Sequence, residues 1–328
     1  MRVYHDEDAS LALIQAKKVA VVGYGNQGRA QALNLRDSGV AEMRIALSAA
    51  SPSRAKAEAD GFTAVTPAQA ASWADVIAIL TPDEGQGALY TNELEPHLKP
   101  GAALVFAHGL AIRFGLIAPR ADLDILLVAP KGPGTALRAD YLAGSGLITL
   151  FAVERDASGT ARPLALAFAA ALGGGRKGMI ETSFAEECEA DLFNEQAVLW
   201  GAIPELILAG YDTLTEAGFS PEIAYFECLT EVKLLADLLI ARGIAGMREA
   251  ISNTAEYGAL VGGPRIVNEN TRAEMRRILA EVRDGAFARR LIAEAEAGYP
   301  ALKAARQASA SHPIEAVAAR MRALSAKG

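Results

Sequence analysis

Cysteine is scarce in this sequence, and several other features that would define a class of protein are missing. The two cysteines, Cys188 and Cys228, are too few for a disulfide framework. No apolar run approaches the roughly 20 residues that are needed to cross a bilayer. The start, MRVYHDEDAS, lacks the basic and then apolar layout of a signal peptide. We therefore expect a cytoplasmic protein with no membrane partner.

Positive charge is also limited. The sequence has 32 basic and 39 acidic residues for a formal net charge of −7, and lysine and arginine form no block. Proteins that bind nucleic acid need a basic patch to neutralise phosphates. The composition therefore argues against a nucleic-acid partner and favours a small molecule. A chain of 328 residues is long enough for about two domains with ordinary hydrophobic cores.

The two halves of the chain differ in their apolar pattern. Up to about residue 182, short apolar runs alternate with amphipathic stretches, which is typical of βαβ units around a parallel sheet. After Ser183, apolar residues recur mostly at helical spacing. We predict a helix over 27–38 and strands over 18–23, 43–47, 62–65, 75–80, 102–107, 124–129 and 147–153. Later helices are predicted over 184–209, 213–218, 223–241, 245–253 and 271–293. The pattern predicts an α/β dinucleotide-binding domain over residues 1–182 and an all-α domain over 183–328.

A GxGxxG turn directly follows the first predicted strand and opens the first predicted helix. Its residues are Gly23, Tyr24, Gly25, Asn26, Gln27 and Gly28. In a dinucleotide-binding turn, the first glycine permits the tight turn, the second lets the backbone approach the pyrophosphate, and the third lets the helix pack on the sheet. The phosphates then lie at the positive N-terminus of the helix. This context favours nucleotide binding over a plain tight turn.

The end of the second predicted strand bears on the choice between NAD and NADP. An acid about 20 positions after the turn would hydrogen-bond to the ribose and repel a 2′-phosphate. This chain has no carboxylate there, and it offers Ser48, Ser51, Ser53 and Arg54 instead. Hydroxyls and a guanidinium suit a phosphate, which favours NADP(H). The alternative is that Ser51 or Ser53 only caps the next helix.

Two carboxylate pairs interrupt largely apolar helices of the second half. Asp191 and Glu195 are four residues apart, and so are Glu227 and Glu231, which places each pair on one helix face. Four carboxylates without a nearby histidine or cysteine in ligand spacing point to Mg²⁺ rather than zinc. Facing pairs could hold two ions. Solvated or salt-bridged acidic faces are the alternative.

Several longer motifs together resemble a known family. GYGNQGRAQALNLRDSG, TPDEGQ, FAHG, VAPKGPG, DLFNEQAVL, EIAYFECLTEVKLL and ISNTAEYG occur in this order. The set closely resembles class I ketol-acid reductoisomerase over essentially the whole chain. The resemblance implies a Rossmann-type N-terminal domain and a helical C-terminal domain that interlocks with a partner subunit, in a homodimer or a higher oligomer of dimers.

The resemblance also implies an activity. In this family, 2-acetolactate or 2-aceto-2-hydroxybutyrate undergoes a Mg²⁺-dependent alkyl shift, and NADPH then reduces the product to a 2,3-dihydroxy acid of valine or isoleucine biosynthesis. By motif, Asp191 is the bridging ligand of two Mg²⁺ ions and Glu195 serves the first ion. Glu227 and Glu231 complete the second site from the partner subunit. The family's other site positions fall on His108 and Lys131 for catalysis, Ser252 for the substrate, and Asp83, Gln86 and Gly134 for the cofactor.

The chain departs from the family pattern around the cofactor. Asn26 replaces a serine, Arg29 replaces a histidine, and Ser48 stands where an arginine usually meets the 2′-phosphate. Leu110 and Ala111 replace a Phe-Asn pair after the histidine motif, and Thr230 replaces a histidine. We expect NADPH still to be preferred, by a smaller margin. A divergent paralogue that acts on a related 2-keto acid and a non-catalytic oligomeric binding protein are the alternative functions.

Overall fold

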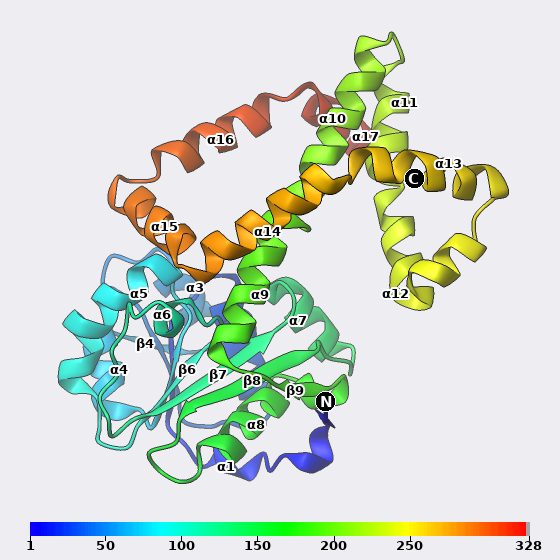
Figure 1. The fold of residues 1–328 in the computed structure, drawn as a ribbon. Helices are drawn as coiled ribbons and strands as arrows, with labels where there is room; N and C mark the ends of the chain where they lie inside the picture. The colour runs from blue at the N-terminus through cyan, green and yellow to red at the C-terminus, as the bar shows by residue number, and fades with distance from the viewer. Residues whose placement is uncertain (326–328) are drawn as a thin grey trace. The chain divides into compact units, whose positions relative to one another are not determined.

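A single β-sheet organises the first part of the chain (Figure 1). The computed structural model describes residues 1–325. The described residues form two compact units, which divide between Ala190 and Asp191. The nine strands of the described residues lie in the order β1-β9-β8-β7-β6-β5-β2-β3-β4. Their bounds are β1 (Val3–Tyr4), β2 (Val19–Val22), β3 (Met43–Ala46), β4 (Thr63–Val65), β5 (Val76–Ile79), β6 (Ala103–Phe106), β7 (Asp124–Pro130), β8 (Thr149–Arg155) and β9 (Met179–Glu181).

The six strands from β2 to β7 are parallel, and their order is that of a dinucleotide-binding sheet. Read from one edge, β4, β3, β2, β5, β6 and β7 correspond to the order 3-2-1-4-5-6, with the direction of winding reversing between β2 and β5. The predicted Rossmann-type fold is therefore confirmed. All seven predicted strands are present. The sheet is not wholly parallel, however, because β8 runs antiparallel to β7 and β1 antiparallel to β9.

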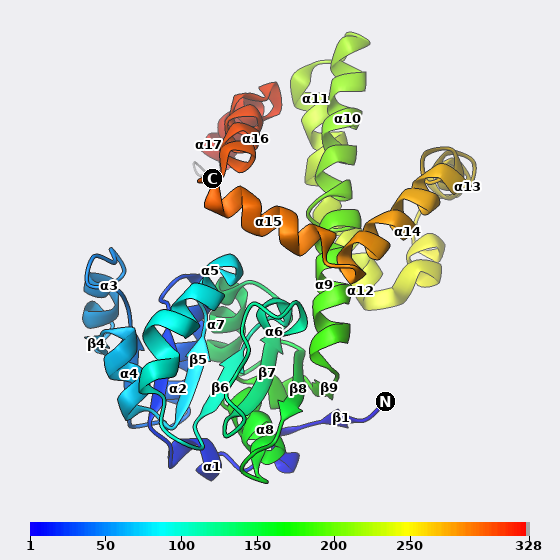
Figure 2. The ribbon, with the colours of Figure 1, turned by 60° about the vertical axis from the view of Figure 1, so that its left-hand side comes forward.

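Helices cover both faces of this sheet (Figures 1 and 2). Alternate residues of β2 enter two different cores: Val19 and Val21 pack with residues of α1, α2 and α8, whereas Ala20 and Val22 pack with residues of α4. Burial on both faces explains the continuous apolar runs in the sequence. The helical segments of this unit are η1 (Asp6–Asp8), α1 (Ala12–Gln15), α2 (Asn26–Asp37), α3 (Arg54–Ala59), α4 (Pro67–Trp73), α5 (Asp83–Leu89), η2 (Tyr90–Leu94), η3 (Glu95–His97), α6 (Leu110–Arg113), α7 (Gly134–Leu142), α8 (Ala161–Ala171) and η4 (Gly174–Arg176).

The rest of the described chain is helical, as predicted. Its first helix, α9 (Phe184–Ala197), contains the division between the two units. It is followed by α10 (Ala202–Glu216), α11 (Pro221–Tyr225), the π-helical η5 (Phe226–Thr230), α12 (Val232–Glu249), α13 (Asn253–Ile266), α14 (Glu269–Arg283), α15 (Ala286–Glu296), α16 (Pro300–Ser311) and α17 (Pro313–Ser325). None of the helices within residues 1–325 is long and apolar enough to cross a membrane.

The bounds of all five helices predicted after Ser183 are wrong, because apolar spacing does not reveal where a helix breaks or continues. The segments 213–218 and 245–253 are not separate helices, since α10 runs from Ala202 to Glu216 and α12 from Val232 to Glu249. The predicted helix over 184–209 stops at Ala197 and resumes at Ala202. The one over 223–241 contains the π-helical turn η5, and the one over 271–293 is broken at Gly285, where φ is +78°. A left-handed residue of this kind ends a helix while the apolar stripe continues beyond it.

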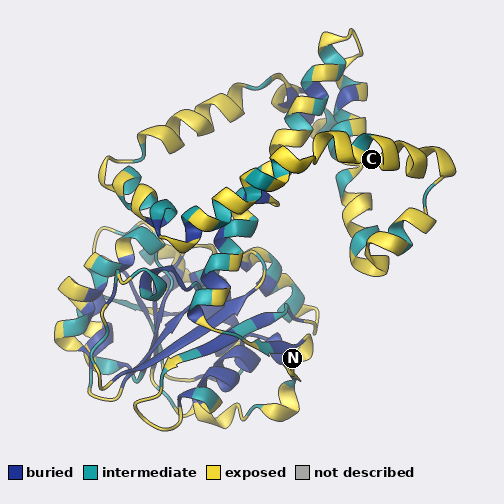
Figure 3. Ribbon diagram, viewed as in Figure 1, coloured by how far each residue is buried: buried dark blue, intermediate teal, exposed yellow. Residues whose placement is uncertain are grey.

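The second unit has a small buried core and an extensive exposed apolar surface. Tyr211, Ala224, Ile314 and Val317 form the buried cluster between α10, α11 and α17. In contrast, α12 and α13 contain no buried residue, and Figure 3 shows both helices largely exposed. Their exposed apolar side chains include Leu234, Leu235, Ile240, Ile244, Tyr257, Leu260, Val261 and Ile266. Apolar surface of this extent marks an interaction site in soluble proteins.

The glycine turn yields a stability prediction with a matched control. A Cβ on Gly28 would lie 2.2 Å from the carbonyl oxygen of Gly23, whereas a Cβ on Gly25 would meet nothing within 4 Å. We expect Gly28→Ala to push α2 away from β2 and to lower the free energy of unfolding by about 1–3 kcal/mol. Gly25→Ala should leave it nearly unchanged. Urea unfolding of both variants tests this, and equal losses would contradict the packing role of Gly28.

Candidate functional site

The carboxyl ends of four neighbouring parallel strands present most of the predicted cofactor and catalytic residues. The glycine turn follows β2, and the segment with Asp83 and Gln86 follows β5. His108 follows β6, and Lys131 follows β7. Because these strands are parallel, the four segments lie at the same edge of the sheet, where open α/β sheets bind their ligands.

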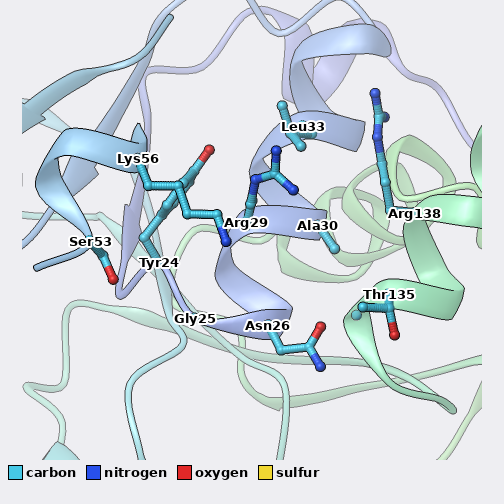
Figure 4. Close-up of a pocket in the computed structure, with 11 residues that line it drawn as sticks. Tyr24, Gly25, Asn26, Arg29, Ala30, Leu33, Ser53, Lys56, Thr135 and Arg138 are labelled. Atoms are coloured by element: carbon cyan, nitrogen blue, oxygen red, sulfur yellow. The ribbon is translucent and has the colours of Figure 1, made fainter. Parts of the chain in front are cut away.

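A pocket of about 420 Å³ opens beside the glycine turn (Figure 4). Ser53 and Lys56 line it from the α3 side, and Thr135 and Arg138 line it from α7. The backbone is also tightly packed here, because a Cβ on Gly134 would lie 2.2 Å from the carbonyl oxygen of Asn26. The N-termini of α2 and α7 therefore approach each other closely at the pocket. Helix N-termini with free backbone N–H groups favour phosphate.

Gln27 and Ser51, both predicted to contact the cofactor, make hydrogen bonds within the protein. The side-chain amide of Gln27 donates to the carbonyl of Gly132 at 2.9 Å, which ties α2 to the loop after β7. Ser53 is the N-cap of α3, but its hydroxyl makes no capping hydrogen bond, so it is not explained as a cap. Ser51 Oγ accepts the backbone N–H of Ser53 at 3.3 Å, and Ser48 is exposed.

Arg54, which the sequence offered as a partner for the 2′-phosphate, donates hydrogen bonds to backbone carbonyls of the protein. Its guanidinium donates to the backbone carbonyls of Leu47, at 3.2 Å, and Ala64, at 2.9 Å. These bonds join the ends of β3 and β4 to α3. The side chain therefore fixes the loop that carries the serines.

Beyond β5, two buried oxygens lack a partner. The side-chain amide of Gln86 donates to the carbonyl of Thr81 and to Asp83 Oδ1. Thr81 Oγ1 and Gln86 Oε1 are buried, and neither makes a hydrogen bond within the protein. Buried polar atoms are rarely left unsatisfied. Their position at the carboxyl edge, beside the glycine turn, is consistent with a polar ligand such as a dinucleotide.

A buried carboxylate, Glu187 of α9, joins His108 and Lys131. Its side chain is only 1% exposed. Glu187 Oε2 accepts the backbone N–H of Gly109 at 2.9 Å and lies 3.1 Å from His108 Nδ1. Lys131 Nζ donates to Glu187 Oε1 at 3.3 Å. One carboxylate thus binds groups from the ends of two strands.

The electrostatics of this cluster favour an ion pair. Burial alone would raise the pKa of Glu187, but the hydrogen bond from His108 and the charges of His108 and Lys131 hold it below its usual range. Burial likewise opposes the charged form of His108, yet the contacts with Cys188 and Glu187 outweigh it and raise the pKa of His108 well above its ordinary value. The contacts between Glu187 and His108 therefore favour the ionised form of each.

Glu187 is not among the residues predicted from the sequence. It precedes Asp191 by four residues and Glu195 by eight, so all three lie along one face of α9. A carboxylate oxygen of Glu187 lies within 4.8 Å of one of Asp191. Extending the i, i+4 pattern by one helical turn toward the N-terminus would have found it. Its burial and its partners, which lie 56 and 79 residues away in sequence, carry no such signal.

Of the four predicted metal ligands, only Asp191 lies in a cluster of three possible ligand atoms within the described residues, with His108 and Glu187. Asp191 is half-buried and Glu195 exposed on α9, whereas Glu227 and Glu231 are exposed at either end of the π-helical turn η5. Within residues 1–325, Glu227 and Glu231 join no cluster of three or more ligand atoms. Ser252 is exposed and caps α13 by accepting the backbone N–H of Ala255 at 3.2 Å.

Comparison with known proteins gives the family. The family model described as acetohydroxy acid isomeroreductase, NADPH-binding domain, matches residues 13–178, and the ketol-acid reductoisomerase C-terminal domain matches residues 184–327. This chain belongs to the ketol-acid reductoisomerase family. A structure of an NADH-preferring ketol-acid reductoisomerase from an uncultured archean is 44% identical, with a TM-score of 0.95 over 99% of each chain.

More distant structures share only the fold with this reductoisomerase chain. A putative oxidoreductase from Jannaschia sp. is 15% identical with a TM-score of 0.63, covering 82% of this chain and 97% of that one. A semialdehyde dehydrogenase NAD-binding protein from Cupriavidus necator is 20% identical with a TM-score of 0.60, covering 82% and 99%. Both likenesses concern the fold alone.

Replacing Glu187 tests the ion pair directly. In Glu187→Gln the imidazolium loses its counter-charge while burial still disfavours it, so the pKa of His108 should fall. The measurement is an NMR titration of the His108 ring proton in metal-free protein. Glu186→Gln is the matched control, because Glu186 accepts from the Thr182 hydroxyl and is not a partner of His108. An unchanged pKa in Glu187→Gln would contradict the pairing.

Proposed function

We propose that this protein catalyses the ketol-acid reductoisomerase reaction on 2-acetolactate or 2-aceto-2-hydroxybutyrate, as in valine and isoleucine biosynthesis. The substrate's C2 alkyl group migrates to C3, and the resulting 2-keto acid is reduced to a 2,3-dihydroxy acid. The observation that carries the proposal is the match of both family domains, which together cover residues 13–178 and 184–327. Residues 1–182 would bind the nucleotide, and residues 183–328 would provide metal and substrate binding and dimerisation.

The nucleotide would bind at the pocket beside α2. The glycine turn and the N-termini of α2 and α7 would bind the pyrophosphate, and Ser53 and Lys56 lie where the adenosine ribose would follow. Asp83, Gln86 and Gly134 are proposed to contact the cofactor. Bound nicotinamide would supply the hydride for the reduction. We propose NADPH as the preferred form by a narrow margin, because Ser48, Ser51 and Ser53 introduce no carboxylate at the strand end.

The metal would be Mg²⁺. Asp191 and Glu195, aligned on α9 next to Glu187, offer the oxygen ligands that Mg²⁺ prefers. Two bound Mg²⁺ ions would supply Lewis-acid catalysis of the alkyl shift. Asp191 is proposed as the bridging ligand, and Ser252 as a contact to the substrate.

The cluster of Glu187, His108 and Lys131 would serve the proton transfers of the reaction. The migration takes the proton from the C2 hydroxyl and leaves the C3 oxygen to be protonated, and the reduction requires a further proton at the C2 carbonyl oxygen. His108 is proposed as the acid or base in these transfers, oriented through Nδ1 by Glu187. Lys131, fixed by the same carboxylate, would order water and stabilise substrate charge.

A second copy of the chain would complete the metal site. Glu227 and Glu231 stand apart from any ligand cluster of their own chain in the described residues. The exposed apolar side chains of α12 and α13 offer a surface for a partner. We propose a homodimer in which these two carboxylates serve the partner's site.

The first experiment measures oxidation of NADPH and of NADH with 2-acetolactate, with and without Mg²⁺. Turnover should need Mg²⁺, and Asp191→Asn should abolish isomerisation because a neutral amide cannot bridge two dications. Reduction of the already isomerised keto acid should survive better in this variant. Asp212→Asn, which removes a surface carboxylate paired with His312, is the control and should stay active. Acetolactate turnover at the wild-type rate in Asp191→Asn or in excess chelator would refute the metal assignment.

Subunit exchange tests the shared site. Separately inactive Asp191→Ala and Glu231→Ala proteins should regain activity when mixed and exchanged. In each heterodimer one site carries both lesions and the other neither, so about half of its sites should be intact. Activity is followed against mixing time, with each variant alone as the control. A fully active monomer, or no recovery after demonstrated exchange, would contradict the proposal.

The third prediction concerns nucleotide preference. Ser48→Arg restores a planar bidentate donor for the 2′-phosphate. It should lower the KM for NADPH, which corresponds to binding that is stronger by about 1–3 kcal/mol, and leave the KM for NADH nearly unchanged. Steady-state kinetics with both cofactors measure this, and Ser48→Gln is the uncharged control. Equal improvement with NADH would show that the strand-end loop does not contact the 2′-phosphate.

Two other functions make different predictions for the same assays. A divergent paralogue would reduce a related 2-keto acid faster than it converts acetolactate. A non-catalytic binding protein would oxidise neither cofactor with any 2-keto acid. The intact set of Asp191, Glu195, Glu227 and Glu231 argues against the second.

A further inference from the structure

An arginine at the wall of the nucleotide pocket is paired with a carboxylate behind it. Arg29, near the start of α2, lines the pocket together with Ser53 and Lys56 (Figure 4). Its Nε donates to Asp60 Oδ2 at 2.7 Å, and its Nη2 donates to Oδ1 at 3.0 Å. This is the two-point geometry in which a guanidinium binds a carboxylate or a phosphate most strongly.

Asp60 is held in place by bonds that do not depend on the nucleotide. The hydroxyl of Tyr24, within the glycine turn, donates to Asp60 Oδ2 at 2.9 Å. Arg36 Nη1 donates to the backbone carbonyl of Asp60 at 2.7 Å. The side chain of Asp60 is 19% exposed and that of Arg29 is 41% exposed. Arg29 lines the pocket and Asp60 does not, so the carboxylate binds the guanidinium from outside the pocket lining.

Both members of the pair stay ionised at neutral pH. The hydrogen bond from Arg29 outweighs the cost of burial and, with that from Tyr24, lowers the pKa of Asp60 to about 2. Burial and the neighbouring carboxylate raise the pKa of Tyr24, so its hydroxyl remains a donor. The charge that Arg29 presents to the pocket is therefore compensated by a fixed negative charge.

We propose that Asp60 is a positioning residue that sets the nucleotide selectivity of this protein by occupying the Nε–Nη2 edge of Arg29 and neutralising its charge. The Nε–Nη2 edge is then not available to the ribose 2′-phosphate. The other N–H groups of Arg29 carry a positive charge that the carboxylate of Asp60 compensates. Asp60, which lies outside the strand-end loop, thus reduces the preference for NADPH over NADH. This inference rests on the proposed function, since it takes the pocket to be the nucleotide site.

Binding of two cofactor fragments to the full-length protein tests the role of Asp60. Isothermal titration calorimetry is carried out with 2′,5′-ADP, which carries the 2′-phosphate, and with 5′-ADP, which lacks it. In Asp60→Asn the amide oxygen can still accept from Arg29, but the compensating charge is gone. Binding of 2′,5′-ADP should tighten about tenfold, or ~1.4 kcal/mol. Binding of 5′-ADP should stay within about twofold of wild type.

Three variants separate this role from general effects. Asp60→Glu keeps the charge and should keep the wild-type ratio of the two affinities. Asp122→Asn removes a carboxylate that binds Arg120 through the same two nitrogens outside the pocket, and should also leave the ratio unchanged. Asp60→Ser is a second neutral replacement, used in place of Asp60→Asn if the latter shows no cooperative thermal unfolding.

Each outcome decides between the alternatives. A rise in the ratio in the neutral variants alone supports the proposal. Equal changes for both fragments would make Asp60 a structural anchor only, and weaker 5′-ADP binding would make it a direct ribose acceptor; either overturns the proposal. If the wild-type protein binds neither fragment, the pocket is not the nucleotide site and both this inference and the nucleotide assignment fail. Failure on acetolactate alone, with the ratio shifted as expected, would count against the proposed reaction and leave the role of Asp60 standing.

Discussion

The parallel pairing of β2, β5, β6 and β7 is the constraint on which the site in the first unit depends. These strands are buried on both faces, so their own side chains are committed to the two cores. Residues available for chemistry must therefore stand where the strands end. Parallel direction brings those ends to one edge, although the glycine turn and Lys131 are about one hundred residues apart in the sequence. The edge then needs only one further group, from α9, to become an organised cluster.

That group is the carboxylate of Glu187. An unpaired buried carboxylate would be costly, and here three donors from the ends of β6 and β7 compensate it. The same bonds orient His108 and Lys131 and favour the charged imidazole. The cluster is therefore interdependent, because His108, Gly109 and Lys131 all bind the one carboxylate of Glu187. Helical spacing on α9 places Asp191 and Glu195 in line with Glu187, and a carboxylate oxygen of Asp191 lies within 4.8 Å of ligand atoms of Glu187 and His108.

The pocket beside α2 shows that an arginine in the sequence is not always available to bind phosphate. Three arginines are near enough in sequence or space to be considered, and each is occupied within the protein. Arg29 pairs with Asp60, Arg54 donates to two backbone carbonyls, and Arg138 binds Asn34 and Asp37. In the proposed nucleotide site, anion binding would therefore depend more on helix N-termini, hydroxyls and Lys56 than on guanidinium groups. Discrimination between the two forms of the cofactor would then be sensitive to single charges such as that of Asp60.

The sequence by itself determined the local elements. Apolar runs predicted the seven strands from β2 to β8, and the glycine turn predicted the start of α2. The four-residue spacing of Asp191 and Glu195 predicted that both lie on one face of a helix, which is α9. These features depend on neighbours a few residues away, which periodicity and turn chemistry record. Only the tertiary structure determined the antiparallel direction of β8, the helix breaks before Ala202 and at Gly285, and the capping role of Ser252. It also determined the partners of Glu187 and of Arg29. A hydrogen bond or ion pair between side chains 31 to 79 residues apart leaves no periodic trace in the sequence, because it depends on which strand ends and helix faces the tertiary structure brings together.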